Sequence, residues 1–292
     1  MTSKRALCDC HSHAYGPYDR FPLAESRTFV PPESPIETLE EIWRQNGVDR
    51  AVLIQGSAYG TDHAALLHAI ARDPERRRGI AILPPDVAEA ELARLHQCGV
   101  RGVRFNWVKH LRPTATLEGA ATLLHRVQPF GWHGEVHIDA EMLDPVEHLA
   151  LPDELPLVID HMARLDASLG INQPLFTKLL RLLEREQIWV KLSGADRLAV
   201  RCDSVHAALP FMKALIRQAP EKCVWGLDWP HVNLATRRSD YELVALVEEA
   251  APEEQAQRKI MIENPARLYG FPLSSLDTDT VKLNPQLSAA SG

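Results

Sequence analysis

Cysteine is scarce in this sequence: there are five in 292 residues, and no two have the Cys-x-x-Cys spacing. This scarcity excludes a disulfide-rich secreted scaffold and the common cysteine-based zinc motifs, and it favours reduced thiols in a cytoplasm. Cys8 and Cys10 occupy alternate positions in a short apolar stretch near the N-terminus. We expect both to be packing residues against an outer helix.

Positive charge is also in short supply, with 32 Lys and Arg residues against 39 Asp and Glu residues and a net charge of -7. No basic block is present, which argues against a nucleic acid or an anionic membrane as partner. No apolar run is long enough to span a bilayer, and the N-terminus lacks the apolar segment of an export signal. The sequence therefore predicts a soluble, cytoplasmic protein with a small-molecule partner.

Apolar residues make up 45% of the chain, and they occur in short runs separated by segments with helical spacing. Ile42 and Trp43 lie three and four positions after Leu39 and are followed by Gly47, which shows that helical spacing. The apolar runs between such segments are predicted strands. They are Leu7–His11, Ala51–Gln55, Gly79–Leu83, Val100–Asn106, Gly134–Ile138, Leu157–His161, Ile188–Ser193 and Cys223–Asp228.

Eight strands, each followed by a helical segment, predict an α/β fold, the (β/α)8 barrel of TIM type. A doubly wound open sheet uses the same alternation, but no glycine-rich phosphate loop follows the first strand. We expect one barrel domain over residues 1–272 and a tail over 273–292 that has little core to bury. Residues 14–35 are expected to form an unusually long first loop.

Barrel enzymes carry their chemistry at the carboxyl ends of the strands. Asp9, His11 and His13 at the first strand are expected to share one face, because side chains alternate along a strand. Imidazole or carboxylate groups also stand at three other strand ends, where burial is costly unless they bind each other, a metal or a substrate. These groups are Glu135, His137 and Asp139, then Asp160 and His161, then Asp228 and His231.

Three imidazole nitrogens and one carboxylate oxygen suit zinc or a similar divalent metal ion. Structural roles remain open beside this metal-ligand hypothesis: Asp228 can be a helix N-cap, and His161 can be a hydrogen-bonded core histidine. The fifth-strand histidine can simply bond Asp139 or Glu135. The proposed ligand set is His11, His13, His137 and Asp228.

Five motifs along the chain occur together in one known family. They are Asp9-Cys10-His11-Ser12-His13, Gly102-Val103-Arg104-Phe105-Asn106, Val158-Ile159-Asp160-His161, Lys191-Leu192-Ser193-Gly194 and Gly226-Leu227-Asp228-Trp229-Pro230-His231. The set resembles the amidohydrolase superfamily (amidohydrolase 2 type), in the branch of the 2-pyrone-4,6-dicarboxylate lactonases. A closing segment, residues 263–271, is similar to the terminal helix of that branch, so the resemblance spans residues 7–271.

The resemblance implies a distorted barrel of the metal-dependent hydrolase type that opens a lactone. Histidines matching His11, His13 and His161 polarise the ring carbonyl in that branch, while the aspartate matching Asp228 takes a proton from water without a metal. The branch has a tyrosine where this chain has His137. Superfamily members with histidine there bind a divalent metal, so a zinc-dependent version and a metal-free version both stay open.

Substrate carboxylates are held in that branch by arginines that match Arg104 and Arg197. For Arg104 an ion pair with Glu135 is the structural alternative, and for Arg197 and Arg164 it is a solvated surface position. Other residues near strand ends are further candidates for substrate contact. These are Ser57, Lys109, Arg164 and His231.

Lys191 shares a strand face with Ser193 and is expected to point into the barrel. An inward lysine needs a carboxylate partner, and Glu135 or Asp9 are the candidates. We expect this structural pairing rather than a Schiff-base lysine.

The function expected from these residues and the resemblance is that of a lactonase, a carboxylic ester hydrolase acting on a small carboxylated lactone. The preferred substrates are 2-pyrone-4,6-dicarboxylate or a muconolactone-like acid, as met in the breakdown of aromatic compounds. A sugar-acid lactonase, a metal-dependent decarboxylase of the same superfamily and a non-catalytic ligand-binding barrel remain alternatives. Homo-oligomer formation also stays open at this point.

Overall fold

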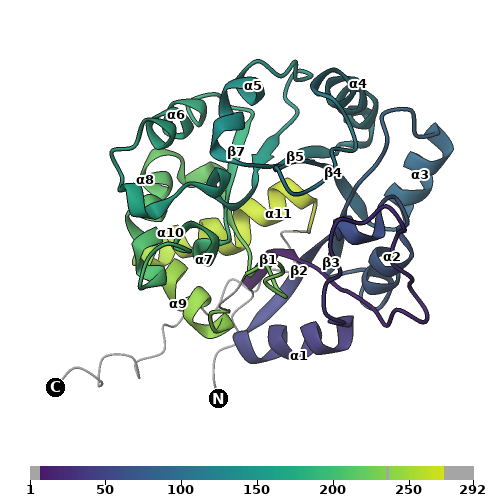
Figure 1. The fold of residues 1–292 in the computed structure, drawn as a ribbon, viewed down its shortest axis with the longest axis horizontal. Coiled ribbons are helices and arrows are strands. Elements are labelled where there is room, and N and C mark those ends of the chain that lie inside the picture. The colour runs from purple at the N-terminus through teal and green to yellow at the C-terminus, as the bar shows by residue number, and fades with distance from the viewer. Residues whose placement is uncertain (1–6, 235–236, 273–292) are drawn as a thin grey trace.

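Eight parallel strands stand at the centre of the computed structural model, which describes residues 7–234 and 237–272 (Figure 1). Strands that follow one another in sequence are neighbours in the sheet. A parallel bridge between Ser12 and Trp229 joins the first edge to the last, which confirms the barrel and excludes an open sheet. The strands are β1 (Leu7–Ser12), β2 (Val48–Ile54), β3 (Arg77–Ala81), β4 (Val100–Trp107), β5 (His133–Ile138), β6 (Leu157–Ile159), β7 (Ile188–Leu192) and β8 (Cys223–Trp225).

Helices follow the strands, and most of them surround the strands on the outside (Figure 1). In the first of them Ile36, Leu39 and Trp43 are buried, and the helix ends at Gly47, whose φ of 71° favours glycine. The helices are α1 (Ile36–Asn46), α2 (Ala64–Ala71), α3 (Glu89–Gln97), α4 (Leu117–Val127), α5 (Leu143–Glu147), α6 (Pro174–Leu182), α7 (Ala195–Leu198), α8 (Leu209–Gln218), α9 (Asp240–Ala250), α10 (Glu254–Arg258) and α11 (Asn264–Tyr269).

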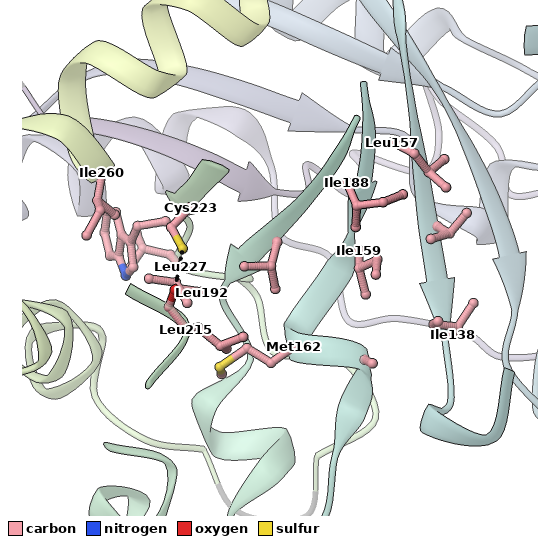
Figure 2. Packing of buried hydrophobic residues seen from close by; sticks show 14 of the residues in the cluster. Ile138, Leu157, Ile159, Met162, Ile188, Leu192, Leu215, Cys223, Leu227 and Ile260 are labelled. Carbon is pink, nitrogen blue, oxygen red and sulfur yellow. Dashed lines mark hydrogen bonds between the residues drawn. The ribbon is translucent and has the colours of Figure 1, made fainter. Parts of the chain in front are cut away.

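The larger hydrophobic core lies between the strands and the outer helices (Figure 2). Leu157 and Ile188, on the neighbouring strands β6 and β7, belong to it and are fully buried. Leu215 of α8 contributes from the helical layer, and its carbonyl accepts a hydrogen bond from the Cys223 thiol at 3.6 Å. Burial of this apolar layer fixes the strands and so the positions of the strand ends.

A second cluster fills the interior of the barrel. Cys8 and Cys10 belong to it together with Val158, Val224 and Tyr269, the last of which comes from α11. The expectation that both cysteines pack against an outer helix is therefore wrong. The pairing of β1 with β2 shifts register between Asp9 and Ser12. Successive side chains of β1 therefore do not simply alternate between the two faces of the strand.

Several predicted strands end earlier than expected, and at the site these are β6, which ends at Ile159, and β8, which ends at Trp225. Beyond them the backbone enters the left-handed region, with φ of 50° at His161 and 64° at Asp228. A non-glycine residue there costs about 1–3 kcal/mol and needs surrounding contacts to hold it. Both residues therefore stand on tight turns just past the strands.

The long first loop is confirmed, because α1 begins only at Ile36. Tyr15 and Phe21 of this loop form a small separate cluster with Tyr59. The predicted tail over 273–292 lies outside the described residues. Among the residues described, no helix combines the length and the apolar character needed to cross a bilayer.

Candidate active site

Three histidines converge on one carboxylate oxygen at the carboxyl ends of the strands. Asp228 Oδ1 lies 3.9 Å from His11 Nε2, 4.0 Å from His13 Nε2 and 3.8 Å from His161 Nε2. All four side chains are at least nine-tenths buried. The residues predicted to act together, which are as much as 217 positions apart in the sequence, do gather at one point.

Asp9 does not belong to this group, although it was expected to share a strand face with His11 and His13. Its Oδ2 accepts hydrogen bonds from Trp43 Nε1 of α1 at 2.8 Å and from the Ser12 hydroxyl at 2.5 Å. Its Oδ1 accepts from the backbone N–H of His11 at 3.0 Å and of Leu227 at 2.9 Å. Asp9 thus ties the end of β1 to α1 and to the segment after β8.

Two glycines make room for the histidines. A Cβ atom on Gly226 would lie 2.6 Å from the Cβ and backbone nitrogen of His11. A Cβ on Gly194, which has a φ of 65°, would lie 3.0 Å from His161. Only glycine allows the chain after β7 and β8 to pass this close to the imidazoles.

The histidines of the site are neutral. Burial lowers the pKa of His11, His137 and His161 well below that of a free imidazole, and that of His13 to about 3. They therefore act through N–H groups or nitrogen lone pairs rather than as imidazolium ions.

Contacts at Nδ1 determine what two of the rings present to the site. His13 Nδ1 lies 2.9 Å from the Ile54 carbonyl, and His137 Nδ1 lies 3.1 Å from Asn106 Oδ1. Each Nδ1–H donates to an oxygen, so each Nε2 carries a lone pair. His161 Nδ1 bonds the Ser193 hydroxyl at 2.8 Å, a partner that accepts or donates. The alternative that His137 bonds Asp139 or Glu135 is wrong.

His11 stands between a cation and a carboxylate. Its Nδ1 lies 3.2 Å from Lys191 Nζ and 3.4 Å from Asp160 Oδ1. A proton on Nε2 leaves Nδ1 to accept from Lys191, whereas a proton on Nδ1 faces Asp160 and leaves a lone pair at Nε2. Both neutral tautomers of His11 therefore have a partner.

Lys191 points into the barrel, as predicted, and its ammonium lies 2.8 Å from Glu135 Oε1 and 3.2 Å from Asp160 Oδ1. Burial alone would lower the pKa of Lys191, but the two carboxylates outweigh it and raise that pKa. Glu135 is thus the confirmed partner, and Asp9 is not. A charged lysine held this way is no Schiff-base nucleophile.

Arg104 is buried and its Nε donates to Asp160 Oδ2 at 2.8 Å. The structural alternative, a pair of this arginine with Glu135, is wrong, because its partner is Asp160, on the turn after β6, and Glu135 binds Lys191. Burial opposes ionisation of Asp160, but Lys191 and Arg104 hold the pKa of its carboxyl below the usual value. Asp160 remains ionised and is already occupied by two cations.

Arg197 binds the central carboxylate directly. Its Nε donates to Asp228 Oδ2, and its Nη1 donates to the Val232 carbonyl at 3.0 Å. The alternative of a solvated surface arginine is wrong, since the side chain is only 8% exposed. Burial raises the pKa of Asp228 against the opposing effect of Arg197. Asp228 Oδ1 has no hydrogen-bond partner among the described residues and faces the three histidines.

The family model described as amidohydrolase matches residues 8–271. The chain belongs to the amidohydrolase family. Among curated relatives of this amidohydrolase, a 2-pyrone-4,6-dicarboxylate hydrolase from Comamonas testosteroni is 31% identical, covering 89% of both chains. A 4-sulfomuconolactone hydrolase from Rhizobium radiobacter is 32% identical, covering 90% of this chain and 89% of its own.

A solved structure similar to this amidohydrolase is that of a putative 2-pyrone-4,6-dicarboxylic acid hydrolase from Pseudomonas putida. It is 32% identical, with a TM-score of 0.80, and the match covers 92% of this chain and 98% of the other. The predicted superfamily, branch and barrel are therefore confirmed.

A divalent metal fits three of the four predicted ligands in this amidohydrolase. Donor atoms of His11, His13 and Asp228 lie within 4.8 Å of one another, and His11 Nε2 and Asp228 Oδ1 lack hydrogen-bond partners in the described part of the chain. The ligand atom of His137 falls outside this group, and its ring packs near His161 with centroids 5.3 Å apart. A group of His11, Asp160 and His161 is equally compact, but Asp160 already binds Arg104 and Lys191.

The other predicted substrate contacts are spread over the amidohydrolase barrel mouth. Arg164 Nε donates to Asp139 Oδ1 at 3.1 Å, and its side chain is 24% exposed. Lys109 is exposed, and its backbone N–H donates to the other oxygen of Asp139 at 3.2 Å. Ser57 begins a short turn after β2 and is partly buried.

His231 was predicted to contact substrate, but both its ring nitrogens are engaged by carboxylates. Nδ1 lies 3.2 Å from Asp196 Oδ2 and Nε2 lies 2.9 Å from Asp240 Oδ1. Neither aspartate was singled out from the sequence. The sequence gives little sign of their role, because Asp196 and Asp240 both lie in the first turn of a helix, where aspartate is common.

Proposed function

We propose that this amidohydrolase is a lactonase that opens a small anionic lactone, with 2-pyrone-4,6-dicarboxylate or a muconolactone-like acid as substrate. One observation carries the proposal: a single oxygen of a buried carboxylate faces the Nε2 atoms of three neutral histidines at 3.8–4.0 Å. The names of the relatives, hydrolases of a pyrone dicarboxylate and of a sulfomuconolactone, support the substrate class.

Asp228 is the proposed general base. Water is a poor nucleophile at neutral pH, so its proton must pass to an acceptor as the new C–O bond forms. Burial raises the pKa of Asp228, which makes this carboxylate a stronger base than an exposed one. Arg197 holds Oδ2, so Oδ1 is the atom that accepts the proton.

Neutral imidazole N–H groups are the proposed donors to the lactone carbonyl oxygen, which gains negative charge as water adds. His11 can serve in its Nε2–H tautomer, in which Nδ1 accepts from Lys191. His161 is the second donor, in the tautomer that leaves Nδ1 to accept from Ser193. His13 donates its Nδ1–H to Ile54, so its Nε2 accepts a hydrogen bond from water or binds a metal instead.

Substrate carboxylates are proposed to bind the cationic side chains at the barrel mouth. Arg197 lies beside the base and Arg164 lies on the turn after β6. Lys109 is the exposed cation of the loop after β4. Arg104 is more deeply placed and acts mainly on Asp160, which makes it a positioning residue for the site. Several cationic side chains in one place favour a substrate with more than one negative charge.

A zinc ion would be held by His11, His13 and Asp228, and when bound it would polarise the lactone carbonyl as a Lewis acid. His11 would then use its Nδ1–H tautomer, with Asp160 Oδ1 as the partner at 3.4 Å. A cytoplasmic location, in keeping with the free cysteines of the described chain, also belongs to this proposal.

A lactone screen with a pH indicator tests the proposal. Purified protein is prepared with chelator and, separately, with zinc, and each form is offered pyrone, muconolactone-like and sugar-acid lactones. Release of acid without carbon dioxide supports a lactonase. Carbon dioxide release would instead identify a decarboxylase, and unchanged compounds in both forms would overturn the proposal. Activity that survives complete chelation excludes the zinc-dependent version.

A further inference from the structure

His231 joins three segments of the chain at one buried point. The residue lies after β8 and is only 3% exposed, and its two ring nitrogens face Asp196 and Asp240 at 3.2 Å and 2.9 Å. Asp196 belongs to α7, which directly follows β7, and Asp240 is the first residue of α9. One imidazole ring thus links the ends of two strands and the start of a helix.

The two contacts define the protonation state of the ring. A neutral imidazole has a lone pair on one nitrogen, and that lone pair would face a carboxylate oxygen here, so both nitrogens carry protons. The contact with Asp196 is an ion pair rather than a hydrogen bond of good geometry. His231 Nδ1 and Asp196 Oδ2 have no hydrogen-bond partner elsewhere in the described residues, so the pair is dedicated.

The imidazolium lies on the turn that carries the proposed base. The His231 backbone N–H donates to the Asp228 carbonyl at 2.9 Å, and both residues are in the left-handed region, with φ of 59° and 64°. Such a turn persists only where contacts over-determine it. Arg197, which follows Asp196 in the chain, donates hydrogen bonds to the same turn at the Asp228 carboxylate and at the Val232 carbonyl. The start of α7 therefore holds this turn through two adjacent side chains.

We infer that His231 is a positioning residue: fixed as a cation between Asp196 and Asp240, it holds the turn that presents Asp228 Oδ1 to the three histidines. The charged groups around it are these two carboxylates, Asp228 and Arg197. This inference rests on the proposed function, in which Asp228 is the base. It assigns His231 to the support of the base rather than to the substrate contact expected from the sequence.

His231→Gln tests this role, because glutamine keeps a hydrogen-bonding amide and loses the charge. We expect kcat for the lactone to fall about 10–100-fold, the range typical of lost supporting contacts, while KM stays within about twofold. Asp240→Asn, at a partly exposed helix start, is the milder second variant and should lower kcat in the same direction. The double variant should be no worse than His231→Gln alone, because the two residues act as a unit.

The matched control is His206→Gln. His206 also pairs with a carboxylate, that of Glu249 at 3.4 Å, but its side chain is 55% exposed. It is not part of the turn that carries Asp228 and His231. This variant should keep kcat, KM and melting temperature. An equal loss of kcat in both histidine variants would contradict a specific role of His231.

Crystal structures of the wild type and of His231→Gln provide a readout that needs no substrate. We expect the Asp228 carboxylate to leave its position on Arg197 in the variant. Displacement of Asp228 in a protein that hydrolyses no lactone would retain the positioning role and reject the proposed function. A folded His231→Gln or Asp240→Asn protein with unchanged kcat, or an unmoved Asp228 turn, would overturn the inference.

Discussion

At the scale of one residue, the surroundings of Asp228 suit the role of the proposed base. A surface carboxylate is solvated and weakly basic, whereas Asp228 is buried and binds Arg197 through one oxygen only. The other oxygen faces His11, His13 and His161. This oxygen has no hydrogen-bond partner in the described chain and belongs to the group of side chains that could hold a metal ion, so it is the candidate position for a water molecule or a metal.

Asp228→Asn should lower kcat about 100- to 10,000-fold, because the amide keeps the shape but cannot accept the proton of water. The measurement is steady-state hydrolysis of the lactone, with the circular dichroism spectrum as a check on folding. Asp144→Asn is the control, since the Asp144 side chain is 69% exposed and pairs with Lys178 on the surface. Similar losses in both variants would refute the role of Asp228.

His231 should make the folded protein lose stability at alkaline pH. Asp196 and Asp240 outweigh burial and raise the pKa of His231 to about 9, from an ordinary value near 6.5. Because the folded pKa is the higher one, the stabilisation is complete below about pH 6.5 and is lost as the pH rises through about 9. Its size is of the order of 3 kcal/mol.

Melting temperatures of the wild type and of His231→Gln in chelator, from pH 6 to 10, measure this contribution. We expect the difference between the two proteins to shrink as the pH rises. A constant difference across that range would show that His231 does not titrate in this way.

At the scale of elements, the junction of β1 and β8 decides the geometry of the site. The Asp228 backbone N–H donates to the His11 carbonyl at 2.6 Å, and the His13 N–H donates to the Trp229 carbonyl at 2.8 Å. Asp9 adds a side-chain bond to Leu227 across the same junction. The hydrogen bonds that close the barrel between β1 and the segment after β8 therefore also position the side chains of the site.

Gly226→Ala should disturb this junction. Its new Cβ would lie 2.6 Å from His11, so backbone must shift, at a cost of about 1–3 kcal/mol in stability and at least about tenfold in kcat. Gly131→Ala is the control: its φ of 66° strains alanine, yet nothing lies within 4 Å of the added atom. It should lose about 1 kcal/mol and no activity.

At the scale of the whole molecule, a chain of charges runs through the interior of the barrel. The hydroxyl of Tyr269 in α11 donates to Glu135 at 3.4 Å, and Glu135 forms an ion pair with Lys191. The Lys191 ammonium in turn contacts Asp160 and His11. The terminal helix is thus connected to the site through residues of β5 and β7. Buried ions of this kind are costly unless every one is paired.

Lys191→Met should leave Glu135 without its cation and Asp160 with Arg104 as its remaining cation. We expect the free energy of unfolding to fall by about 3–5 kcal/mol. Urea denaturation measures the change. Lys178→Met is the control, because Lys178 pairs with Asp144 and Glu147 near the surface and should change stability by less than about 1 kcal/mol. A Lys191 variant as stable as the control would contradict a paired ionic interior.

Sequence alone determined the barrel, because the alternation of apolar runs and helical spacing is a local property of the chain. It also placed His11, His13, His161 and Asp228 at strand ends, which the fold brings together. Only the tertiary structure decided the partners of individual side chains, such as Asp160 for Arg104 and two aspartates for His231. It also turned Asp9 toward α1 through a register shift. Such contacts depend on ångström-scale distances between residues far apart in the chain, and no local periodicity encodes them.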